Sequence, residues 1–102
     1  MADFTFEVDG TTYELLYAEK RVEMAESAIG NKSIISVFTA QPTLRETKTI
    51  FAYGIRESGQ SVWVNPTQAI ELAGKYLQEH GYAQMIEAVS DSLMKDCGFL
   101  FR

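Results

Sequence analysis

The sequence predicts an α+β fold, in which an N-terminal β-hairpin is followed by four to five α-helices in one mainly helical domain. Three observations support this class. Apolar residues alternate around an Asp-Gly near the start, and they recur at helical spacing over most of the remaining chain. The length of 102 residues suits a single domain. We divide this domain, 1–102, into a hairpin (3–17), a helical part (18–98) and a short apolar tail (99–102).

The hairpin is predicted by residues 4–17, which read FTFEVDGTTYELLY. Asp-Gly is the dipeptide that a type I′ turn favours, because both central residues of that turn need a positive φ. With Asp9 and Gly10 as the loop, three pairs of side chains share one face: Val8 with Thr11, Phe6 with Tyr13, and Phe4 with Leu15. Five of these six are apolar or aromatic, so we expect this face to pack against the helices.

The segment from 18 to 42 is expected to contain two helices. Apolar residues fall at helical spacing over 18–29 and again over 31–40. Gly30 stands where a left-handed residue commonly ends a helix. Pro42 would break the second helix.

A third helix is predicted to begin at a capping box, Thr43 to Glu46, and to end just before Gly59. Its expected apolar stripe contains Leu44, Thr47, Phe51 and Ile55. The segment 61–64 has an extended pattern, which is compatible with either a short strand or a surface crossing.

Two further helices complete the predicted fold. Asn65 followed by Pro66 is a typical helix start, with Asn as the N-cap. This helix should end at Gly81, and the last helix should end at Gly98. On the outer face we expect one ion pair at i,i+4 spacing: Glu71 with Lys75.

Composition narrows the partners and the compartment. The formal net charge is −5, and the nine Lys and Arg residues are scattered. Nucleic acid is therefore not an expected partner, because phosphate binding needs clustered basic residues. No apolar run approaches the ~18 residues that span a membrane. Residues 1–9 lack the pattern of a secretory signal, so we expect a cytoplasmic protein that does not bind membranes.

Catalytic groups are sparse. The single histidine, His80, is expected at the end of a helix, where a cation interacts favourably with the helix dipole. The single cysteine, Cys97, falls on an apolar stripe and is interpreted as a small buried residue. There is no phosphate-binding glycine motif. We therefore expect no catalytic residue, no cofactor and no metal site, and hence no enzymatic activity.

Four apolar residues are left unexplained by the helical stripes and the hairpin face. Trp63 lies among polar neighbours and could be either a core residue or an interface anchor. Phe99, Leu100 and Phe101 have no polar counterface. Such a stretch either folds back onto the core or offers apolar surface to a partner. These four are the candidate partner-binding residues.

The order of these elements resembles a known family. A hairpin of the form FxFEVDGTTYEL is followed by a helix that ends in Ile-Gly, a short helix in NKSIISVF, a capped third helix, and two helices joined through HGY. This order is similar to that of the small tail assembly chaperones of long-tailed bacteriophages, especially those of Gram-positive hosts.

The resemblance implies a role without catalysis. Such chaperones bind and solubilise the helical tape measure protein in the bacterial cytoplasm, pass it to the tail tube protein, and leave before the virion is complete. The implied partners are the tape measure protein, the tail tube protein and further copies of this chain. Two alternatives stay open: a structural minor tail or head–tail connector protein of a phage or prophage, and a bacterial protein-binding adaptor.

Overall fold

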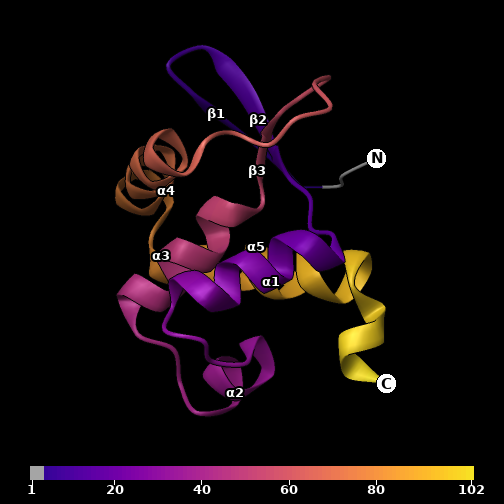
Figure 1. The fold of residues 1–102 in the computed structure, drawn as a ribbon. Helices are drawn as coiled ribbons and strands as arrows, with labels where there is room; N and C mark the ends of the chain where they lie inside the picture. The colour runs from indigo at the N-terminus through magenta and orange to yellow at the C-terminus, as the bar shows by residue number, and fades with distance from the viewer. Residues whose placement is uncertain (1–3) are drawn as a thin grey trace.

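A computed structural model of the chain describes residues 4–102, so the first residue of the predicted hairpin range, residue 3, lies outside the described part. The described chain has an α+β fold, as predicted, with a three-stranded antiparallel sheet of order β1-β2-β3. In chain order the elements are β1 (Thr5–Val8), β2 (Thr11–Leu15), α1 (Glu19–Ala28), α2 (Ile34–Thr39), α3 (Leu44–Tyr53), β3 (Ile55–Glu57), α4 (Pro66–His80), α5 (Tyr82–Asp96) and the 3₁₀ turn η1 (Gly98–Phe101). Figure 1 shows the sheet at one end of the molecule, α2 at the other, and α1, α3 and α5 between them.

The hairpin has the predicted turn and register. Asp9 and Gly10 have φ values of 51° and 84°, and the strand pairs include Val8 with Thr11 and Phe6 with Tyr13. The apolar face is buried against α3 and α4. The ring centroid of Phe6 lies 5.4 Å from that of Phe51 in α3 and 5.3 Å from that of Tyr76 in α4. This aromatic cluster attaches the sheet to the helices.

Two predictions about the third helix are wrong. The third helix does not reach Gly59, because α3 ends at Tyr53 and Ile55 begins the strand β3, which pairs with β2. Leu44, expected on the inner stripe, is exposed. The segment 61–64 forms no further strand, although Trp63 makes a single antiparallel bridge to Arg56 in β3.

The end of α3 is fixed by residues that are distant in sequence. The Tyr17 hydroxyl donates a hydrogen bond to the carbonyl oxygen of Ile50 (2.7 Å), and Nε of Arg21 donates to that of Tyr53 (2.9 Å). Both carbonyls belong to the last turn of α3, where intrahelical partners run out. The next carbonyl, that of Gly54, accepts the N–H of Leu16 at 2.8 Å. The chain is thereby drawn out of the helix and into the sheet.

Gly54 allows this close approach because it lacks a side chain. A Cβ atom placed there would lie 2.5 Å from Cζ of the Tyr17 ring. An aromatic ring held by its own hydroxyl bond cannot move aside cheaply. The glycine at this position is therefore required by packing.

The predicted helix caps are largely confirmed. Gly30 has a φ of 90°, and the amides of Gly30 and Asn31 bond to the carbonyls of Ser27 and Glu26, as in a Schellman motif. Thr43 and Glu46 form the expected capping box, and Asn65 caps α4.

Lys75, which we expected to pair with Glu71, forms its ion pair with Asp9 at the hairpin tip, at 2.7 Å. Among residues 4–102, no helix is both long and apolar enough to cross a bilayer.

We predict opposite effects for two glycine-to-alanine substitutions. Gly54→Ala should lower the free energy of unfolding by about 1–3 kcal/mol, because the new methyl group collides with the Tyr17 ring. Gly74→Ala should raise it by roughly 0.5–1 kcal/mol, because Gly74 lies inside α4 and a methyl group added there would meet open space. Urea denaturation of both variants checks the pair, and equal effects would contradict the packing role of Gly54.

We also predict a loss of stability at alkaline pH that depends on Tyr17. Burial first, and then the negative charge of Asp96, raise the pKa of Tyr17 well above its ordinary value. The folded state therefore holds this proton more tightly than the unfolded state does. Its stabilising effect is complete below the unfolded pKa of about 10 and is lost as the pH rises above that value.

Urea midpoints measured between about pH 8 and pH 11 check this expectation. The fall above about pH 10 should be smaller in Tyr17→Phe than in the parent chain. An identical fall in both proteins would show that Tyr17 is not the responsible group.

Candidate partner-binding site

An apolar groove of about 310 Å³ lies between α2, α5 and η1. We call it the α2–α5 groove. Its lining residues are Ile34, Ile35, Phe38 and Thr39 from α2, Ser90, Leu93 and Met94 from α5, and Phe101 from η1. The floor is buried core, since Ile34 and Leu93 are each only 1% exposed. None of these lining residues is charged.

Large apolar side chains are exposed around this groove. Met94 is 60%, Phe101 50% and Ile35 37% exposed, and they make up half of the six large hydrophobic residues that are exposed within residues 4–102. Single exposed apolar residues are ordinary on protein surfaces, whereas a cluster of them beside a concave apolar surface is typical of a binding site. The α2–α5 groove is therefore the candidate site.

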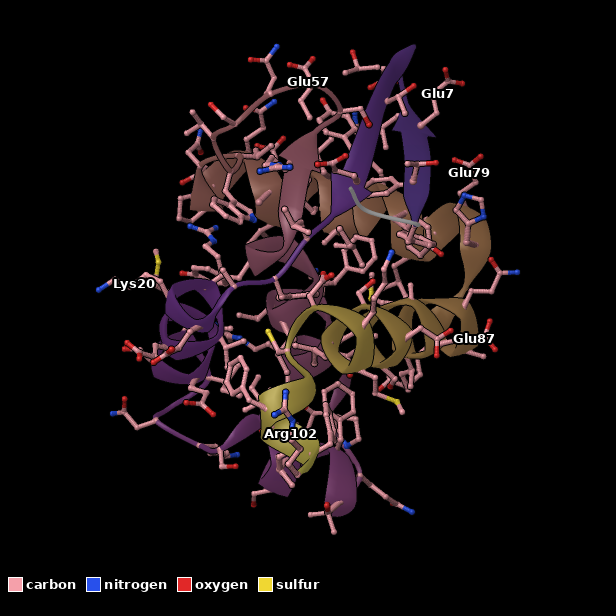
Figure 2. The ribbon with its side chains drawn as sticks, turned by 90° about the vertical axis from the view of Figure 1, so that its right-hand side faces the viewer. Glu7, Lys20, Glu57, Glu79, Glu87 and Arg102 are labelled. Atoms are coloured by element: carbon pink, nitrogen blue, oxygen red, sulfur yellow. The ribbon has the colours of Figure 1, made fainter. Side chains whose placement is uncertain are left out.

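The surface of α5 outside the groove is acidic. Glu87 and Asp91 are exposed and lie about two turns and one turn before Met94. Figure 2 shows Glu87 on α5 pointing away from the body of the molecule. Over α5 itself, Tyr82–Asp96, three acidic residues and one lysine leave a net charge of −2. A partner that spans α5 beside the groove would meet negative charge.

The three apolar residues of the tail, which forms the 3₁₀ turn η1, have different environments. Leu100 packs partly buried against the core, and its N–H donates to the Cys97 carbonyl oxygen at 2.9 Å. Phe99 and Phe101 are about half exposed, and of these only Phe101 lines the α2–α5 groove. The structure therefore unites one of the three predicted tail residues with the groove.

Trp63 has internal partners. Its indole N–H donates to the Leu16 carbonyl oxygen at 2.8 Å. The guanidinium carbons of Arg21 and Arg56 lie 5.2 Å and 5.4 Å from its ring, within cation–π distance. Arg56 is also paired with Glu14 at 2.8 Å. Trp63 thus fastens the 61–64 segment to the sheet, and it does not line the groove.

The single histidine and the single cysteine are in ordinary structural settings. The His80 ring packs on Tyr76, with centroids 4.5 Å apart, at the end of α4 where the sequence placed it. Cys97 is fully buried, and desolvation raises the pKa of its thiol, which disfavours the reactive thiolate. Within the described residues, no group of three or more His, Cys, Asp or Glu side chains could hold a metal ion.

A second, more polar cleft of about 470 Å³ lies along a neighbouring face of α5, which includes Glu87 and Asp91. Its lining residues are Phe4, Leu15, Tyr76, Gln84, Glu87, Ala88, Asp91, Ser92, Lys95 and Asp96. One carboxylate oxygen of Asp96 already accepts the N–H of Tyr17 at 3.0 Å. Burial, followed by the charge of Glu87, raises the pKa of the Tyr76 phenol, so this group remains a neutral hydroxyl. The cleft offers hydrogen-bonding groups, but its described lining contains neither histidine nor cysteine.

The sequence interpretation missed the contribution of α2 and Met94 to the site. A signal was present in residues 34–38, IISVF, where four of five residues are apolar. A short surface helix can bury only about one stripe, so some of these side chains had to remain exposed. Ile34 and Val37 are buried, whereas Ile35 and Phe38 reach the groove.

Comparisons with models of protein families, with curated proteins and with solved structures found no match to this chain. Function is therefore inferred from the α2–α5 groove and from the resemblance in the sequence.

We predict different roles for two neighbouring tail residues. Leu100→Ser should lower the free energy of unfolding by about 1 kcal/mol, because part of its side chain leaves the core. Phe101→Ser should lower it by less than Leu100→Ser does, because half of the Phe101 side chain is already in solvent. Thermal and urea unfolding of both variants check this division. A larger loss for Phe101→Ser would place Phe101 in the core.

Proposed function

We propose that this chain is a tail assembly chaperone of a long-tailed bacteriophage, which binds and solubilises the tape measure protein in the host cytoplasm and acts without catalysis. The observation that carries the proposal is the α2–α5 groove with its exposed rim of Ile35, Met94 and Phe101. Such a groove can bind and cover the apolar surface of another protein.

The shape and polarity of the groove favour a helical partner. An amphipathic helix commonly lays its apolar stripe into a hydrophobic groove between helices. The groove contributes apolar side chains from α2, α5 and η1, and among the lining residues that the structure describes, Thr39 and Ser90 alone carry a hydroxyl group. A long helical protein with a repeated apolar stripe, such as a tape measure protein, presents many such segments.

The charge of the surrounding surface favours basic residues beside that stripe. Glu87 and Asp91 on α5 would attract Lys or Arg side chains that flank the apolar positions of the partner helix. The same acidic surface keeps the chaperone from binding nucleic acid. Membrane binding is no part of this function.

Many weak contacts suit a chaperone better than one strong contact. Copies bound along one extended client gain affinity from avidity, yet each copy can leave separately. Release to the polymerising tail tube protein would then proceed copy by copy, and no chaperone would remain in the mature virion. Contact with the tail tube protein and self-association into a homo-oligomer belong to the same proposal.

We predict that Met94→Lys weakens client binding without harming the fold. The new charge sits at the mouth of the groove and repels a basic helix, while a cation near the end of α5 suits the helix dipole. The matched control is Val62→Lys, because Val62 is a 72% exposed apolar residue outside the groove. Affinity for the tape measure protein should fall roughly tenfold in the first variant and stay unchanged in the second.

The measurement is co-expression with the tape measure protein from the same genome, followed by assays of its solubility and by pull-down. Failure of the parent chain to bind or solubilise that protein would contradict the proposal. Detection of this chain in purified virions would favour the structural minor tail or connector alternative. Binding to host proteins in the absence of any tape measure protein would favour the adaptor alternative.

A further inference from the structure

The helix α2 lies between two residues with unusual backbone conformations. Asn31 has a φ of 61° and Gln41 a φ of 73°. Asn adopts this left-handed region more readily than most residues, whereas a Gln there is uncommon. Gln41 is also followed by Pro42, which further restricts its backbone. Residues held in such conformations often store strain at places where a structure switches or clamps a ligand.

The packing of α2 is light. It has six residues, of which only Ile34 and Val37 are buried. Figure 1 shows α2 set apart from the other helices and joined to them by a loop on each side. This helix nevertheless forms one wall of the α2–α5 groove, through Ile34, Ile35 and Phe38. The position of α2 therefore sets the width of the groove.

One carboxylate ties the two loops together. Oε2 of Glu46 lies 2.7 Å from Nζ of Lys32, which precedes α2, and Oε1 accepts the N–H of Thr43, which follows α2, at 2.9 Å. The hydrogen bond from the Glu46 N–H to the Thr43 hydroxyl completes the capping box at 3.1 Å. We call this set of contacts the Glu46 latch. A second carboxylate, that of Glu26, accepts the N–H of Ile34 at 2.9 Å.

We propose that α2 is a hinged flap, which turns at Asn31 and Gln41, is held closed by the Glu46 latch, and opens to admit a partner helix into the α2–α5 groove. The identity of the partner rests on the proposed function, whereas the motion of α2 does not. Opening would let Gln41 leave its left-handed conformation and would widen the groove down to Leu93, and closure would cover that apolar surface again.

This flap would give the groove two useful states. In the free chain, the closed flap keeps Ile34 and Leu93 away from water and from other copies. In the bound chain, the partner helix covers the surface that opening exposes. A partner helix can enter the groove only after the Glu46 latch is broken. Closure of the flap therefore competes with binding of the partner and promotes its release.

Hydrogen exchange of the chain alone tests the motion. In Lys32→Ala the ion pair of the latch is lost, while the capping box is retained. The amides of residues 34–39 should then exchange about two to five times faster, the change expected when an exposed ion pair is removed. Amides of α3, α4 and α5 should exchange at their original rates.

The matched control is Lys75→Ala. The Lys75–Asp9 pair is also 2.7 Å long, and the two lysine side chains are similarly exposed, 57% for Lys75 and 58% for Lys32. This substitution should leave exchange in α2 unchanged. Faster exchange of α2 in the control, unchanged exchange in Lys32→Ala, or acceleration of every helix in Lys32→Ala would each overturn the flap.

Binding of the tape measure protein separates this inference from the proposed function. If exchange in α2 responds as expected but the parent chain does not bind the tape measure protein, the flap stands and the proposed function fails. If the parent chain binds the tape measure protein but exchange in α2 does not change in Lys32→Ala, the proposed function stands and the flap fails. When both are correct, Lys32→Ala should associate with the client faster than the parent chain does.

Discussion

The contact of Tyr17 with the end of α3 is the interaction on which the rest of the structure depends. Its ring occupies the space that a side chain at Gly54 would need, and its hydroxyl bonds to the Ile50 carbonyl oxygen. Arg21, in the first turn of α1, donates a hydrogen bond to the last carbonyl oxygen of α3. These contacts end α3, release the chain into β3 and position α1 against α3. Sheet and helices are joined at this point.

Local signals in the sequence were sufficient for most elements, and non-local contacts account for the main error. The hairpin register, the capping box at Thr43 and the start of α4 each depend on a few neighbouring residues, and the structure has all three. The strand β3 depends on β2 and on Tyr17, more than thirty residues earlier, so periodicity alone extended α3 through it. The candidate site was only partly predictable, because Phe101 was foreseen while the neighbouring wall of α2 was not.

Two opposed surface properties meet in this small protein. Its acidic exterior favours solubility and discourages unspecific association, since like charges repel. The α2–α5 groove offers apolar surface that water does not favour. The proposed client-binding function requires both properties. The acidic exterior keeps the protein dispersed before it meets its partner, and the apolar groove binds the partner. The light packing of α2 and the latch at Glu46 supply a means to keep that apolar surface covered until it is used.

The pairing of β2 with β3 has a consequence for the order of folding. Leu15 pairs with Ile55, so roughly forty residues must be closed into a loop before this part of the ladder forms. The hairpin and the individual helices need only short loops and can form earlier. Until β3 arrives, the inner edge of β2 has unpaired backbone groups, which are a template for association with other chains. Completion of the sheet therefore closes this edge of β2 to association with other chains.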